Sequence, residues 1–78
     1  MKREEFLKEL EVELKISKSS NYTLRNYHTI NTELLDFSDK YPKDIEESDV
    51  KLFISEKLAD KSSSTIILYL AAIRYAYI

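Results

Sequence analysis

The chain has 78 residues, with no cysteine, no glycine, one proline and a formal net charge of −2. This length suits a single domain, and the absence of cysteine excludes a disulfide framework and a thiolate metal site. With charged residues spread through apolar periodicity and no long apolar run, the sequence predicts an all-α protein of the cytoplasm that neither spans a membrane nor is exported.

The first half of the chain predicts two helices. Phe6, Leu10 and Leu14 follow one another at intervals of four among lysines and glutamates, and with Leu7 they indicate an amphipathic helix over residues 2–15. The Ser/Thr/Asn-rich segment that follows offers side-chain oxygens to the free N–H groups of a helix start. A second helix is therefore expected to begin near Ser20, with an apolar stripe of Leu24, Tyr27, Leu34 and Phe37.

The second half of the chain predicts two more helices. Pro42 ends the second helix, because proline donates no backbone hydrogen bond. One face of a short third helix is lined by Val50, Phe53, Ile54 and Leu58. The Ser/Thr-rich run KSSST signals another start, and no breaker interrupts residues 66–78, so the fourth helix is expected to reach the chain end. Its expected buried stripe consists of Ile66, Leu70, Ile73 and Tyr77. The prediction is a compact four-helix bundle.

Three residues of the second helix need individual interpretation. Asn31 occupies a position where an apolar residue is expected, so either Ile30 takes over the core position or Asn31 is buried with a partner. Tyr27 lies on the apolar stripe and is expected in the core. His28 is the one histidine of the chain, which argues against a metal site.

Charge is unevenly distributed along the chain. Residues 1–14 carry −2 and residues 29–60 carry −5, whereas residues 15–28 carry +3 and residues 61–78 carry +2. The two positive stretches contain the two Ser/Thr-rich helix starts. A helix start presents unpaired N–H groups and a positive dipole end, so hydroxyls beside lysines there are candidates for phosphate contact. Serine and threonine are also good helix caps, and the pattern leaves both interpretations open.

Several short motifs occur in a fixed order along the chain. Ser20, Thr23 and Tyr27 fit the frame that opens the second helix of a known module, and Ile45, Asp49 and Val50 fit the entry to its third helix. The pattern of its fourth helix is matched at Ser62, Thr65, Leu70, Ala72, Ile73 and Arg74. Over essentially its whole length the chain resembles the N-terminal core-binding domain of tyrosine recombinases and phage-type integrases, a SAM-like four-helix module.

The resemblance implies a DNA-binding module that clamps duplex DNA for site-specific recombination and integration in a prokaryotic cell. In this family the second and fourth helices cross the major groove, and a separate C-terminal domain cuts the strand with Arg, Lys, His and Tyr. We therefore expect residues 1–78 to be a non-enzymatic domain of a longer recombinase, without cofactor or metal. The expected partners are double-stranded DNA and other recombinase protomers, and not a membrane.

The resemblance also suggests which side chains contact DNA. Hydroxyls at the two helix starts are candidates for phosphate contact, and a lysine before each start adds charge. Arg25 and Asn26 are candidates for guanine and adenine edges. Ile67 and Tyr69 stand where the family has polar residues, so contact by the fourth helix is expected to end at its first turn. The candidate residues are Lys18, Ser20, Thr23, Arg25, Asn26, Thr29, Lys61, Ser62, Ser63 and Thr65.

A helical protein–protein interaction module with no DNA-binding role is the alternative. The apolar surplus at Tyr69, Tyr75 and Ile78 is compatible with an interface. The substitution Arg25→Glu separates the two hypotheses, because it is expected to abolish DNA binding under the first and to leave partner binding intact under the second.

Overall fold

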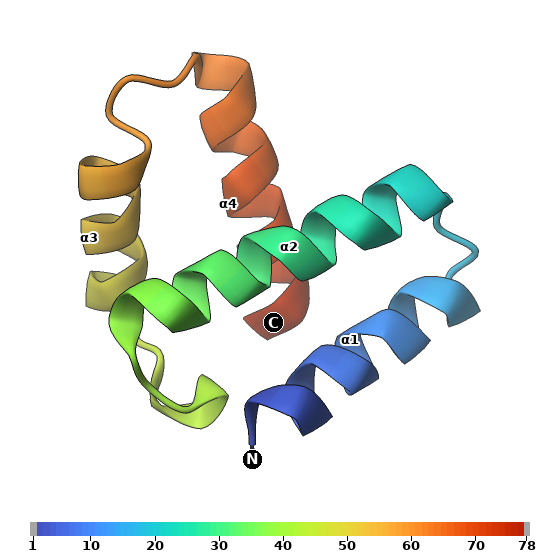
Figure 1. Cartoon of the computed structure of the whole chain (residues 1–78). Helices are drawn as coiled ribbons and strands as arrows, with labels where there is room; N and C mark the ends of the chain where they lie inside the picture. The colour runs from blue at the N-terminus through green and yellow to red at the C-terminus, as the bar shows by residue number, and fades with distance from the viewer. Residues whose placement is uncertain (1, 78) are drawn as a thin grey trace.

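The computed structural model describes residues 2–77, which form four α-helices and one short 3-10 helix (Figure 1). The elements are α1 (Arg3–Ile16), α2 (Asn21–Ser38), η1 (Pro42–Asp44), α3 (Glu47–Lys57) and α4 (Ser63–Tyr77). The described residues contain no strand, so the predicted all-α fold with four helices is confirmed. Ile78, the expected end of the fourth helix, lies outside the described residues.

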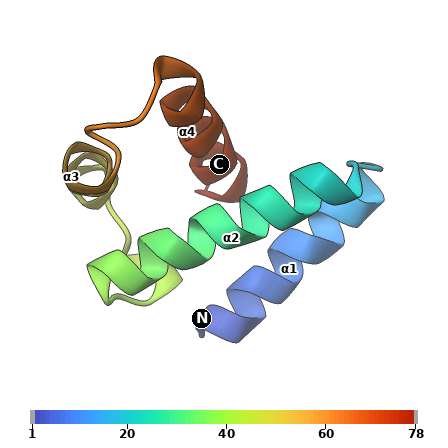
Figure 2. The ribbon, with the colours of Figure 1, turned by 45° about the horizontal axis from the view of Figure 1, so that its top comes forward.

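Helix α2 is the centre of the arrangement and contacts each of the other three helices. Helix α1 lies alongside it, α4 crosses its middle, and α3 lies beside its C-terminal half (Figures 1 and 2). No helix among residues 2–77 has the length and apolarity needed to cross a bilayer.

The main hydrophobic cluster joins α2, α3 and α4. Its buried members are Ile30, Leu34, Phe53, Leu58, Ala72 and Ile73. A second cluster lies under α1, where Phe6, Leu7 and Leu35 are buried and the Phe6 ring stacks on Tyr77 with 5.0 Å between centroids. The predicted apolar stripe of the first helix is confirmed, because all four of its residues are buried.

The predicted stripe of the fourth helix is only partly right. Ile73 is buried as expected, but Ile66, Leu70 and Tyr77 are half-buried, and Ala72 takes the other fully buried position. Helix α4 crosses α2 at an angle, so only a short part of it is covered by that neighbour. In the second helix, Leu24 is likewise half-buried rather than in the core.

Asn31 ties α2 to α4 within the core. Its side chain is fully buried, and Nδ2 donates to the carbonyl oxygens of Tyr27 at 2.9 Å and of Ala72 at 3.2 Å. Ile30 is buried as well, so both alternatives considered for this position are true together. A buried amide without partners would cost several kcal/mol. The bond to Ala72 therefore favours the observed crossing of α2 and α4 over other placements.

Two left-handed residues end α1 and α2. Lys18 has a φ of 58° and Asp39 a φ of 54°. The Lys18 N–H donates to the carbonyl of Lys15 and the Ser19 N–H to that of Leu14, which turns the chain from α1 into α2. Glycine usually occupies this position, and an L-residue with a side chain costs roughly 1–2 kcal/mol there. The chain contains no glycine, so a lysine adopts this conformation.

Candidate nucleic-acid interface

Helices α2 and α4 begin with the same local structure. At α2 the Thr23 N–H donates to Ser20 Oγ at 3.1 Å, and the Ser20 hydroxyl donates to Thr23 Oγ1 at 3.0 Å. At α4 the Thr65 N–H donates to Ser62 Oγ at 3.3 Å, and the two hydroxyl oxygens lie 3.1 Å apart. Ser20 and Ser62 therefore cap the two helices, as the Ser/Thr-rich starts predicted, whereas within residues 2–77 the threonine hydroxyls contact only the serine hydroxyls. The two serines are exposed and the two threonines are half-buried.

Each of these starts keeps free N–H groups. Among residues 2–77, the backbone N–H groups of Asn21 and Tyr22 have no acceptor, and neither do those of Ser63 and Ser64. No acidic residue lies in the first turn of either helix. Each start therefore presents two donors and the positive end of a helix dipole, which is the arrangement that binds an anion.

Helices α1 and α3 begin differently, with acids in the first turn. These are Glu4 and Glu5 in α1 and Glu47 and Asp49 in α3. The Asp49 carboxylate accepts from the Glu46 N–H at 2.8 Å and from Lys40 Nζ at 3.0 Å. These two bonds, the first more than the second, hold the pKa of Asp49 below its usual value of 3.8. A carboxylate of the chain therefore already occupies the positive end of α3.

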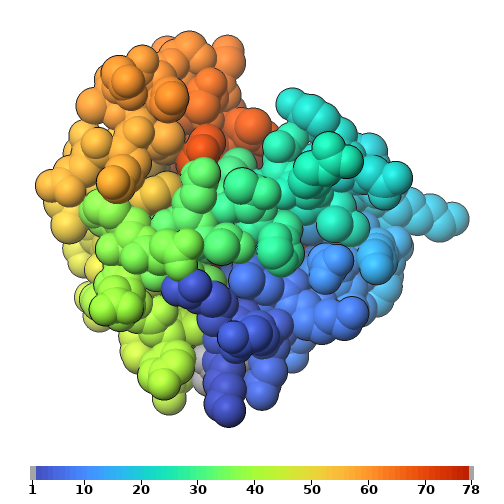
Figure 3. Space-filling model, in the orientation of Figure 1, coloured from blue at the N-terminus to red at the C-terminus, as the bar shows by residue number. Residues whose placement is uncertain are grey.

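An exposed lysine precedes each of the two open starts. Lys18 lies two residues before Ser20 and Lys61 directly before Ser62, and both side chains are exposed. Neither makes an ion pair within residues 2–77. The segment that joins α1 and α2 protrudes from the surface at the right of Figure 3. A positive charge therefore lies close in sequence to the free N–H donors of each start.

The two open starts lie on the same side of the molecule, apart from one another. In Figure 1 both are in the upper half, α2 beginning at the right and α4 at the top, whereas α1 and α3 begin in the lower half. Between the two open starts the space-filling view is indented where α4 passes behind α2 (Figure 3). In this view the two starts therefore lie in the same half of the molecule without contacting one another.

The remaining candidates on α2 differ in exposure. Arg25 and Thr29 are exposed as expected, but Asn26 is half-buried and is a poorer candidate for reaching a base edge than the sequence indicated. Arg25 and Thr29 line a shallow hollow with Glu11 of α1. Ser63 is exposed at the start of α4. The acid beside Arg25 weakens the positive potential there.

The structure also bears on metal binding and on the tyrosines of α4. No group of three metal-ligating side chains occurs within residues 2–77. The Tyr69 hydroxyl donates to Glu33 at 2.8 Å, and both burial and this bond raise the pKa of Tyr69. Tyr75 is 42% exposed and Ile78 lies outside the described residues. Of these apolar residues, Tyr69 is half-buried, whereas Tyr75 remains exposed on one side although its ring packs against Tyr27 at 5.7 Å between centroids.

Comparison with known proteins adds nothing to these observations, because no family model, no curated protein and no solved structure matches the chain. The functional interpretation depends on the chemistry of the helix starts. Two features were not predicted from sequence: the left-handed Lys18, and the contrast between the acid-free starts of α2 and α4 and the acidic starts of α1 and α3. The absence of glycine was a signal for the first, and the lack of acids after each Ser/Thr cluster was a signal for the second.

Proposed function

We propose that this domain is the DNA-binding module of a tyrosine recombinase or integrase and holds duplex DNA through the starts of α2 and α4. One observation carries the proposal: two helix starts with the same Ser–Thr cap, free N–H groups and a nearby lysine lie on one side of the fold. The two starts that carry acids lie on the other side. This division suits an anionic partner with repeated phosphates.

Each start binds a backbone phosphate in this proposal. The phosphate oxygens accept from the two free N–H groups and from the cap hydroxyls, and the lysine adds an unspecific attraction. Such contacts fix the position of the domain on DNA but read no sequence. Arg25, exposed one turn into α2, is the candidate reader of a guanine edge. Strand cleavage belongs to a separate catalytic domain of a longer protein.

The strain at Lys18 also supports the proposal. A left-handed lysine is less favourable than glycine by roughly 1–2 kcal/mol. Strained residues are concentrated at functional positions, where selection retains them in spite of their cost. A lysine retained in the turn before an open helix start is consistent with a role for its charge.

The substitutions Ser20→Asp and Ser62→Asp test the proposal. Aspartate caps a helix as well as serine does, so the free energy of unfolding is expected to change by less than about 0.5 kcal/mol. The added negative charge repels phosphate, and each substitution is expected to weaken binding to a short duplex about tenfold, a difference of about 1.4 kcal/mol. Fluorescence anisotropy at low and moderate salt measures the affinity, and thermal unfolding measures the stability.

Ser48→Asp is the matched control, because Ser48 is an exposed serine in the first turn of α3. It adds the same charge on the other side of the molecule and is expected to leave DNA affinity nearly unchanged. If all three variants bind DNA like the original chain, or if the original chain does not bind duplex at low salt, the proposal is wrong. In that case the hydroxyls are helix caps and nothing more.

A further inference from the structure

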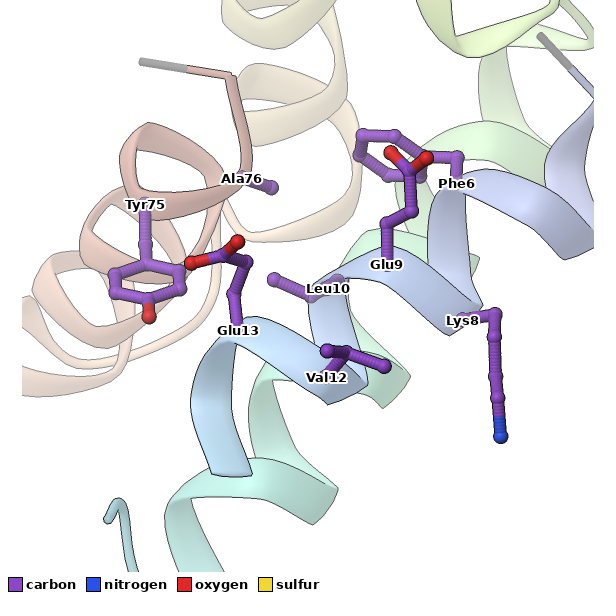
Figure 4. Close-up of a pocket in the computed structure, with 8 residues that line it drawn as sticks. All are labelled: Phe6, Lys8, Glu9, Leu10, Val12, Glu13, Tyr75 and Ala76. Atoms are coloured by element: carbon purple, nitrogen blue, oxygen red, sulfur yellow. The ribbon is translucent and has the colours of Figure 1, made fainter. Parts of the chain in front are cut away.

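A groove separates α1 from the last turns of α4. Its Tyr75 end lies near the turn that precedes α2, because the Tyr75 hydroxyl oxygen is 3.4 Å from Ser17 Oγ. The groove has a volume of about 660 Å³, and its walls include Phe6, Leu10 and Val12 from α1 and Tyr75 and Ala76 from α4 (Figure 4). Most of this lining is apolar. The groove lies beside the second hydrophobic cluster, so its base is fixed by packed side chains.

Large apolar side chains remain exposed at this groove. Val12 and Tyr75 are each 42% exposed, and Ile16 is 69% exposed one helical turn beyond Val12. Val12 and Ile16 lie outside the stripe that α1 buries against α2. Adjacent exposed apolar residues with packed residues beneath them are typical of an interaction surface. Their spacing of one turn suits contact with the side-chain ridges of another helix.

Acidic side chains of α1 border the same groove. Glu9 and Glu13 line it, and Glu13 points toward Tyr75 and Glu9 toward Phe6, whereas Lys8 extends away (Figure 4). Like charges one turn apart destabilise a helix. Within residues 2–77 neither glutamate has a cation within 4 Å. The border of the groove therefore carries two carboxylates that form no ion pair within residues 2–77, although Lys8 lies on the same turn of α1.

We propose that this groove binds a basic amphipathic helix of a partner protein. The apolar face of that helix packs between Phe6 and Tyr75, and its flanking lysines or arginines pair with Glu9 and Glu13. Charge decides among the occupants: a nucleic acid is repelled by the two glutamates, and a second copy would bring two acidic α1 helices together. None of the residues that line this groove is among those proposed to contact DNA, so the inference does not depend on the proposed function.

Two synthetic helical peptides of about four turns test the assignment. Both carry leucines on one face, and they differ only in having either lysines or glutamates beside that face. The lysine peptide is expected to shift the amide resonances of α1 and of residues 72–77, with an effect that weakens as salt rises. The glutamate peptide is expected to produce no shift there.

The charge-reversed double variant Glu9→Lys/Glu13→Lys sharpens the test. It is expected to bind the lysine peptide at least about tenfold more weakly, because two attractions become repulsions, and to gain affinity for the glutamate peptide. Glu56→Lys/Asp60→Lys is the control, since it makes the same change of net charge at exposed positions near the end of α3. This control is expected to retain the preference for the lysine peptide, and thermal unfolding checks that both variants fold.

Four results overturn the proposal. Equal binding of the two peptides shows that charge does not select the occupant. Shifts that appear away from α1 and the end of α4, or an equal loss of binding in the control variant, show that the groove is not the site. Shifts at the groove that grow with protein concentration in the absence of peptide identify a second copy of the chain as the occupant.

Discussion

The four helix starts form two contrasting pairs. Helices α1 and α3 begin with acids, which offset the positive end of the helix dipole and stabilise a helix typically by 0.3–1 kcal/mol each. Helices α2 and α4 begin with neutral Ser–Thr caps and no acid. The starts of α2 and α4 therefore lack this stabilisation, whereas those of α1 and α3 have it. A helix start that is capped but not neutralised keeps a potential that attracts an external anion.

The contrast is spatial as well as chemical. The open starts of α2 and α4 share one side of the molecule, and their relative position depends on how the two helices cross. Within residues 2–77, the bond from Asn31 to the carbonyl of Ala72 joins these two helices in the core, and the Tyr69–Glu33 bond joins them at the surface. A change at Asn31 therefore tests whether the two starts act as a pair.

The largest expected effect is that of Asn31→Ala. The substitution removes two buried hydrogen bonds and leaves space in the core, and we expect a loss of about 2 kcal/mol in the free energy of unfolding. Denaturant unfolding measures it. Asn26→Ala is the control, because Asn26 is half-buried on the same helix and makes no side-chain hydrogen bond within residues 2–77. Similar values for the two variants would mean that Asn31 does not hold α2 against α4.

The next effect in size is that of Lys18→Gly, which separates stability from binding. Glycine removes the left-handed strain, so the variant is expected to be more stable by about 1 kcal/mol. It also removes a charge before the α2 start, so DNA affinity is expected to fall several-fold and the salt dependence to become shallower by about one unit of slope. Thermal unfolding and anisotropy at several salt concentrations measure the two quantities.

Asp39→Gly provides the comparison for Lys18→Gly. Asp39 is the other left-handed residue, at the end of α2, far from its start. We expect a similar gain in stability, without the loss of DNA affinity. A gain of stability at Lys18 with unchanged DNA affinity would mean that the lysine serves the turn alone.

The helices and their caps could be predicted from sequence because they depend on neighbouring residues. The starts of α2 and α4 could be predicted because a cluster of Ser, Thr and Asn residues is a local signal, and Ser20 and Ser62 are the caps within these clusters. The stripe of α1 was equally readable, since its partner α2 covers the whole face. In α4 the stripe was misplaced, because spacing shows which face is apolar but not how much of it a crossing helix covers.

Features that depend on distant residues could not be predicted in the same way. Asn31 contacts Ala72, 41 residues further along the chain, and no local pattern specifies that bond. The groove beside Tyr75 forms where α1 lies against the end of α4, a contact that no local pattern predicts. The two glutamates one turn apart on α1 could be identified from sequence. Half of the candidate interface was therefore readable: the caps were identified, but the side of the fold that they share was not.

The smallest expected effect lies at the neutralised start of α3 and uses Asp49→Asn, which keeps an oxygen acceptor but removes the charge. The folded state lowers the pKa of Asp49, so its contribution to stability is complete above the usual value of 3.8 and is lost as the pH falls through the lowered value. The variant is therefore expected to have a slightly lower Tm at pH 7, and the difference is expected to disappear in acid.

Lys40, the partner of Asp49, determines the high-pH limit of this stabilisation. The hydrogen bond to Asp49 raises the pKa of Lys40 above 10.5, so its contribution is complete below that pH and is lost as the pH rises further. The difference in Tm between the original chain and Asp49→Asn should thus be constant across the neutral range. A difference that varies between pH 5 and 9 would show that another group titrates at this start, and the contrast between neutralised and open starts would need revision.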